Sequence, residues 1–100
     1  MSDGEQRPVV LLVDDETEIT ANLAQILTRS GFDTHTAADG QHALEAVAQL
    51  DPDLVVCDVL MPRLDGREFL RQLRAADRWT PVILLTQVGE SFERAAALDE

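Results

Sequence analysis

Three unbroken runs of apolar residues organise this chain of 100 residues: Val9–Val13, Leu54–Cys57 and Val82–Leu85. Because their apolar residues do not alternate with polar ones, each run predicts a strand buried on both faces, as in a parallel sheet. A more polar stretch, Asp33–Ala37, suits a strand at the edge of that sheet. The pattern therefore predicts four strands, and the third of them ends at Asp58.

Apolar residues at helical spacing occupy the segments between these strands. The expected inward positions are Ile19, Leu23, Ile26 and Leu27 in a first helix, Ala43, Leu44, Val47 and Ala48 in a second, and Phe69, Leu70 and Leu73 in a third. Gly31 provides a stop for the first helix, and Asp39 opens the second. Asp65 and Glu68 resemble a capping box that starts the third, and a last helical stretch follows Gly89. Alternating strands and helices predict an α/β fold, with a parallel sheet and helices on both of its faces.

The predicted strands end in residues that can carry chemistry. Asp14 and Asp15 follow the first strand, Asp58 ends the third, and Thr86 follows the fourth. Open α/β sheets bind their ligands at this edge, and three carboxylates converge there if the first and third strands are neighbours. Clustered carboxylates repel one another without a cation, and Mg²⁺ prefers oxygen ligands of this kind. A metal beside a carboxylate nucleophile allows an aspartyl phosphate to form, and the Thr86 hydroxyl can bond a phosphoryl oxygen.

Composition narrows the class of protein further. A net charge of −11 with 45% hydrophobic residues indicates a globular chain with an acidic surface. Nucleic-acid binding is not expected, because a phosphate backbone needs a basic patch. A membrane span is not expected either, since no apolar run approaches about 20 residues. With no signal-peptide core near the N-terminus, the expected location is the cytoplasm.

A few residues have ordinary structural interpretations. Cys57 is the sole cysteine and is expected to be a small buried hydrophobe. His35 and His42 lack an acid or cysteine at metal-binding spacing, so surface or edge positions are expected. Trp79 is expected to cover the end of the third helix.

Three motifs in this order resemble the receiver domain of response regulators in two-component signalling. They are Asp14-Asp15 after an apolar strand, Asp58-x-x-Met61-Pro62-x-x-Asp65-Gly66, and an apolar strand that ends in Thr86. The resemblance implies a flavodoxin-like, doubly wound α/β sheet of strand order 2-1-3-4-5, with the active site between the first and third strands.

The resemblance also implies a role for each site residue. Asp58 would be the phosphoacceptor, and Thr86 the switch hydroxyl that moves onto the phosphoryl group. Asp15 would ligate Mg²⁺ directly, Asp14 mainly through water, and the backbone carbonyl of Leu60 would be a further ligand. The expected partner is a histidine kinase or a histidine phosphotransfer protein. The expected chemistry is self-catalysed phosphoryl transfer and autodephosphorylation at Asp58 only, rather than that of an enzyme.

The sequence departs from the family pattern in one respect. Receivers place a lysine at the end of a fifth strand, followed by a fifth helix, whereas all eight basic residues here are arginine. Without these last elements, residues 9–100 are expected to be an incomplete receiver of strand order 2-1-3-4. Residues 1–8 are expected to be a polar N-terminal segment. The fourth strand, Val82–Leu85, would then have an unpaired edge, which predicts either self-association or marginal stability.

Two alternatives stay open at this point. A haloacid-dehalogenase-like, Mg²⁺-dependent phosphatase also uses an Asp after an apolar strand. It needs Asp-x-Asp-x-Thr, however, whereas this chain has Glu16 in place of the second Asp. A receiver-like interaction module that is not phosphorylated is favoured by the missing lysine. The acids and Thr86 argue against that module.

Overall fold

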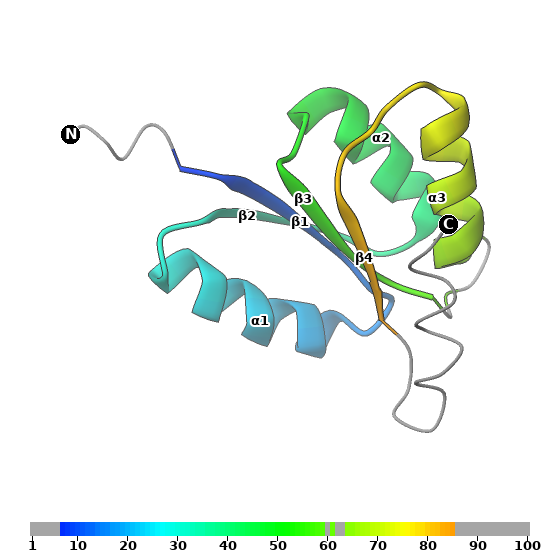
Figure 1. Cartoon of the computed structure of the whole chain (residues 1–100). Coiled ribbons are helices and arrows are strands. Elements are labelled where there is room, and N and C mark those ends of the chain that lie inside the picture. The colour runs from blue at the N-terminus through cyan, green and yellow to red at the C-terminus, as the bar shows by residue number, and fades with distance from the viewer. Residues whose placement is uncertain (1–6, 60, 62–63, 86–100) are drawn as a thin grey trace.

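The computed structural model describes residues 7–59, 61 and 64–85 (Figure 1). Strands and helices alternate along these residues: β1 (Val9–Val13), α1 (Thr17–Arg29), β2 (Asp33–Ala37), α2 (Gly40–Leu50), β3 (Leu54–Asp58), α3 (Gly66–Ala75) and β4 (Val82–Leu85). This order confirms the four predicted strands and the first three helices. The Leu60 carbonyl, the Thr86 hydroxyl and the helical stretch after Gly89 lie outside the described residues.

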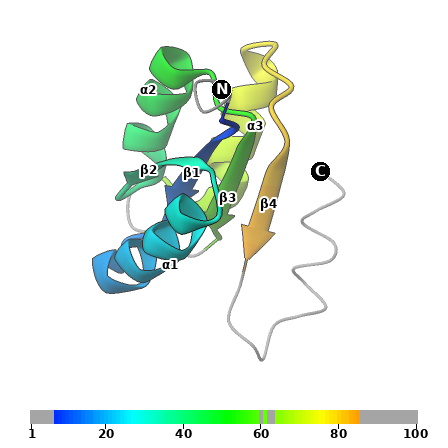
Figure 2. The ribbon, with the colours of Figure 1, turned by 90° about the vertical axis from the view of Figure 1, so that its left-hand side faces the viewer.

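The four strands form one parallel sheet of order β2-β1-β3-β4. From β1 at the centre the chain moves outward to β2, then returns past β1 to β3 and β4. The strand order therefore reverses between β1 and β3, which is where such sheets bind ligands. One face of the sheet carries α1 and the other carries α2 and α3 (Figures 1 and 2). The doubly wound, flavodoxin-like fold expected from the sequence is confirmed.

The main core lies between the sheet and the helices α2 and α3. Alternate strand residues point into it, because successive side chains in a strand face opposite sides. Its buried members are Leu11, Val13, Ala37, Val55, Cys57, Val59 and Leu84 from the strands and their ends, Ala43 and Val47 from α2, Met61, and Phe69, Leu70 and Leu73 from α3. Phe69 is fully buried, and truncating such a residue to alanine typically costs about 3–5 kcal/mol.

The ends of the helices follow the signals in the sequence. Gly31 has a φ of +103°, and its N–H and that of Phe32 bond the carbonyls of Thr28 and Leu27, which is a Schellman motif at the end of α1. At the start of α3, the Asp65 carboxylate accepts the N–H of Glu68 at 3.0 Å. Both signals are local in sequence, and this explains why they could be recognised there.

Two predicted inward faces are partly wrong. In α1, Ile19 and Ile26 are 51% and 58% exposed, whereas Thr20 is buried. The helix is turned so that its inward stripe runs along Thr20, with Leu23 and Leu27 half-buried. In α2, Ala48 is exposed, because at 100° per residue it lies about 140° around the helix from Ala43.

The prediction that Trp79 covers the end of α3 is only partly right, because the residue meets this end of the helix but is not buried. Its side chain is 70% exposed, although it does meet the last turn of α3 through the guanidinium of Arg74, 5.4 Å from the ring centroid. Arg74 also donates to the carbonyls of Arg78 at 3.0 Å and Thr80 at 2.8 Å. The connection from α3 to β4 is therefore held by an arginine, with the indole stacked outside it.

Candidate metal centre

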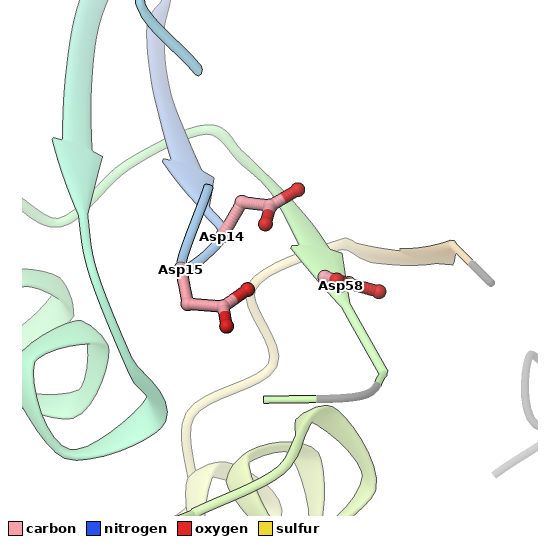
Figure 3. A group of neighbouring side chains, drawn as sticks. All are labelled: Asp14, Asp15 and Asp58. Carbon is pink, nitrogen blue, oxygen red and sulfur yellow. The ribbon is translucent and has the colours of Figure 1, made fainter. Parts of the chain in front are cut away.

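Three carboxylates meet at the edge of the sheet where its order reverses. Asp14 and Asp15 follow β1, and Asp58 is the last residue of β3 (Figure 3). One ligand oxygen from each can be chosen so that all three lie within 4.8 Å of one another. The structure therefore brings together the three acidic side chains that the sequence analysis singled out, although 44 positions separate Asp14 from Asp58.

Strand pairing explains this convergence. Val13 of β1 is level with Cys57 of β3. The residues that follow them, Asp14 and Asp58, therefore lie at the same edge of the sheet. The N–H of Asp14 donates to the carbonyl of Ala37 at 3.1 Å, which extends the ladder with β2. Its carboxylate then accepts the N–H of Glu16 at 2.9 Å, a local turn that leads the chain into α1.

The charged form of Asp14 is disfavoured where it lies in this cluster. The pKa of Asp14 is raised above its ordinary value, mainly by burial and then by the neighbouring Asp15 carboxyl, while the Glu16 N–H acts in the opposite direction. Burial and the Asp15 carboxyl make the charged form of Asp14 less favourable, whereas the hydrogen bonds from backbone N–H groups favour it. A divalent cation among the oxygens would offset the repulsion. Carboxylates at the mouth of an open sheet fit Mg²⁺, which usually keeps several waters.

Cys57 lies directly behind this cluster. As expected, its side chain is buried, and it donates a hydrogen bond to the carbonyl of Asp58 at 3.3 Å. Burial raises the pKa of the thiol to about 12, with a smaller contribution from the carboxylates of Asp58, Asp14 and Asp65. The thiol is therefore protonated at neutral pH and acts as a donor to the backbone, not as a nucleophile or a metal ligand.

A hollow adjoins the cluster between the first turns of α1 and α2, and sequence reasoning missed it. It has a volume of about 140 Å³ and is lined by Asp14, Thr17, Thr20, Thr36, Ala37, Ala38 and His42. His42 is exposed, as expected, yet it borders the hollow that contains Asp14. No spacing in the sequence could reveal this, because the lining comes from α1, β2, α2 and the connections beside them, which only the fold brings together. His35 is half-buried on the edge strand β2 and lies 3.3 Å from the carboxylate of Asp33.

A four-stranded parallel sheet with an acidic cluster at its switch point defines the class of protein. The sequence model of the response regulator receiver domain matches residues 10–100, and the chain belongs to this family. The receiver domain is a module of two-component signalling.

Individual relatives agree with this assignment. The transcriptional regulatory protein TcrA of Mycobacterium tuberculosis is 47% identical over 90 residues, which are 90% of this chain and 36% of TcrA. The chain thus spans about a third of the length of this curated relative. The receiver domain of NtrX from Brucella abortus has a TM-score of 0.83 at 33% identity, covering 90% of this chain and 77% of that domain.

A further solved relative carries ligands. The response regulator protein TrrA from Thermotoga maritima, in complex with Mg²⁺-BeF, has a TM-score of 0.75 at 33% identity. The match covers 93% of this chain and 83% of TrrA. Within the described part of this chain, no helix is long and apolar enough to cross a membrane.

Proposed function

We propose that this chain is a phosphoacceptor module of a two-component or phosphorelay system. Asp58 takes a phosphoryl group from the phosphohistidine of a histidine kinase or a histidine phosphotransfer protein, and Mg²⁺ assists. The observation that carries the proposal is the convergence of Asp14, Asp15 and Asp58 within 4.8 Å at the switch point of the sheet. Family membership and the Mg²⁺-BeF complex of TrrA support it.

The side chains divide the work between them. Asp15 would hold Mg²⁺ directly, Asp14 mainly through a water molecule, and Asp58 through a carboxylate oxygen. The Leu60 carbonyl would be a further protein ligand, and the Thr86 hydroxyl would respond to the phosphoryl group. Both of these residues lie outside the described part of the chain. Mg²⁺ supplies positive charge that offsets the negative charge of the carboxylates and of the phosphoryl oxygens.

The transfer itself needs little from the protein beyond position. A carboxylate oxygen of Asp58 forms a bond to phosphorus, the bond from phosphorus to the donor nitrogen breaks, and its electron pair returns to the imidazole. Hydrolysis of the acyl phosphate later restores the carboxylate, so Asp58 is modified and regenerated instead of turning over a substrate. Catalysis of this kind consists of positioning and charge stabilisation.

The alternatives explain the chain less well. The phosphatase interpretation leaves Glu16 where its second Asp belongs, and the family match is to receivers. An interaction module without phosphorylation gives no reason for three carboxylates to share one site at an electrostatic cost. We also propose that the chain itself binds neither nucleic acid nor membrane, because its net charge is −11. The expected location remains the cytoplasm.

The test is phosphorylation by acetyl phosphate with Mg²⁺, followed by intact mass and by acid-labile phosphate. The wild-type chain should gain one phosphoryl group, and Asp58→Asn should gain none, because an amide cannot form the acyl phosphate. Asp65→Asn is the matched control: it removes a nearby charge, but asparagine caps a helix as well as aspartate does.

Three results would contradict the proposal. Label that persists on Asp58→Asn would place the acceptor elsewhere. A folded wild-type chain that is never labelled would favour the interaction module. Release of phosphate from free phosphate esters would favour the phosphatase.

A further inference from the structure

Gly66, the first residue of α3, lies directly against the peptide that follows Asp58. A Cβ atom at this position would be 2.5 Å from the carbonyl oxygen of Asp58 and 3.0 Å from the Cα of Val59. Both are backbone atoms, which cannot rotate away as a flexible side chain can. Gly66 does not need glycine for its own backbone conformation, since the glycine with positive φ among the described residues is Gly31. Close approach is the remaining reason for glycine here.

The end of β3 is held at this point from several directions. The N–H of Val59 donates to the carbonyl of Leu85 in β4 at 2.9 Å, and the N–H of Gly66 donates to the carbonyl of Val59 at 2.9 Å. The thiol of Cys57 donates to the carbonyl of Asp58 at 3.3 Å. The backbone that carries the Asp58 side chain is therefore fixed between β4 and the first turn of α3.

We infer that Gly66 is a positioning residue for Asp58. By lacking a side chain, it lets α3 begin against the backbone of Asp58 without displacing the end of β3, so that the Asp58 carboxylate stays beside Asp14 and Asp15, which follow β1. The inference rests on the proposed function, because its consequence is a correctly spaced Mg²⁺ site. Any Cβ would need to move from 2.5 Å to the 3.4 Å at which ordinary contact begins. Ligand distances at a metal site tolerate only about 0.2 Å, so even a shared displacement disturbs the cluster.

The chain offers a matched control at Gly40, the first residue of α2. A Cβ there would lie 2.4 Å from the carbonyl oxygen and 2.9 Å from the Cβ of Leu64. Gly40→Ala thus creates the same kind of overlap at the same position of a helix, but against a residue outside β3. Gly66→Ala and Gly40→Ala should both lower the urea midpoint, and only the first should act on Asp58.

Two measurements on the 100-residue chain separate positioning from a general loss of stability. Mg²⁺ titration followed by amide shifts should show affinity weakened about tenfold or more in Gly66→Ala, and little change in Gly40→Ala. Without metal, the carbonyl ¹³C shift of Asp58 should move in Gly66→Ala only. Both variants are measured with the osmolyte trimethylamine N-oxide, which favours the folded state.

Equal losses of affinity in the two variants would overturn the inference. So would an unmoved Asp58 carbonyl shift in folded Gly66→Ala. A wild-type chain that does not respond to Mg²⁺ would instead count against the proposed function. The metal-free carbonyl shift would then still decide the role of Gly66.

Discussion

At the scale of single residues, Asp14 shows how the site acts against the stability of the fold. Its pKa is raised, first by burial and then by Asp15, so the folded chain holds this proton more tightly than the unfolded chain does. Protonated Asp14 therefore favours folding below the raised pKa. That contribution is lost as the pH rises from the ordinary aspartate range through the raised value. At neutral pH, ionised Asp14 lowers the stability of the folded chain. A bound cation would offset this cost.

Asp14→Asn should remove this cost. Asparagine keeps the oxygen that accepts the Glu16 N–H, so the local turn is preserved. In urea unfolding without divalent cations, the variant should gain stability over wild type as the pH rises through this window, and the gain should then level off. We expect less than about 1 kcal/mol, because Asp14 is still partly in water. A difference that shrinks as the pH rises would show that the burial of Asp14 is not the dominant effect.

At the scale of elements, the sequence predicted what local pattern determines. Unbroken apolar runs of four or five residues located β1, β3 and β4, and glycine and aspartate at the helix ends located their boundaries. The rotation of a helix was harder to predict. Ile19 and Ile26 have the spacing of an inward face, yet the way α1 lies on the sheet leaves both exposed. Helical spacing defines a stripe, but the partner surface decides which edge of it is buried.

In the candidate site, too, some features could be predicted from the sequence and others depend on packing. Its acids could be found because strand ends meet at one edge of a parallel sheet, a rule that needs no distances. The close approach of Gly66 to the Asp58 carbonyl could not be found in this way, because it depends on where α3 lies against β3 to within a few tenths of an ångström. A glycine directly after a capping Asp65, where any good helix former would serve, was the available signal.

Arg74 provides a test at the scale of elements, because one side chain joins α3 to the connection that leads into β4. Arg74→Ala should cost about 1–3 kcal/mol, since it removes donors to the carbonyls of Arg78 and Thr80. The emission of Trp79 should change as well, and the chain contains one tryptophan and no tyrosine, so the signal is specific.

Arg71→Ala is the control for Arg74, because Arg71 is exposed on the same helix and pairs only with Glu68 among its described contacts. We expect it to lose about 0.3–0.5 kcal/mol. Urea unfolding gives the stability difference and fluorescence gives the state of the indole. Equal effects of the two substitutions would show that Arg74 is an ordinary surface residue.

At the scale of the whole molecule, apolar side chains are exposed on one face of the sheet. Ile83 and Leu85 of β4 are 41% and 43% exposed, and alternation along the strand turns them away from the core side, where Leu84 is buried. Ile19 and Leu85 line a hollow of about 50 Å³ beside α1. This apolar surface includes side chains of β4, the strand at one edge of the described sheet. Exposed apolar surface on an edge strand favours association between copies of the chain.

We therefore expect the 100-residue chain to associate as its concentration rises. Ile83→Lys should shift it towards the monomer, because the substitution removes apolar area, worth about 25 cal/mol per Å² when buried, and adds a charge to an edge strand. Trp79→Gln is the control: it removes the indole, 70% exposed, from the other end of β4, and should leave the association unchanged.

Sedimentation velocity over a range of concentrations measures both variants. A wild-type chain that stays monomeric at every concentration would show that this face needs no partner. Equal effects of the two substitutions would show that association does not depend on the face beside α1.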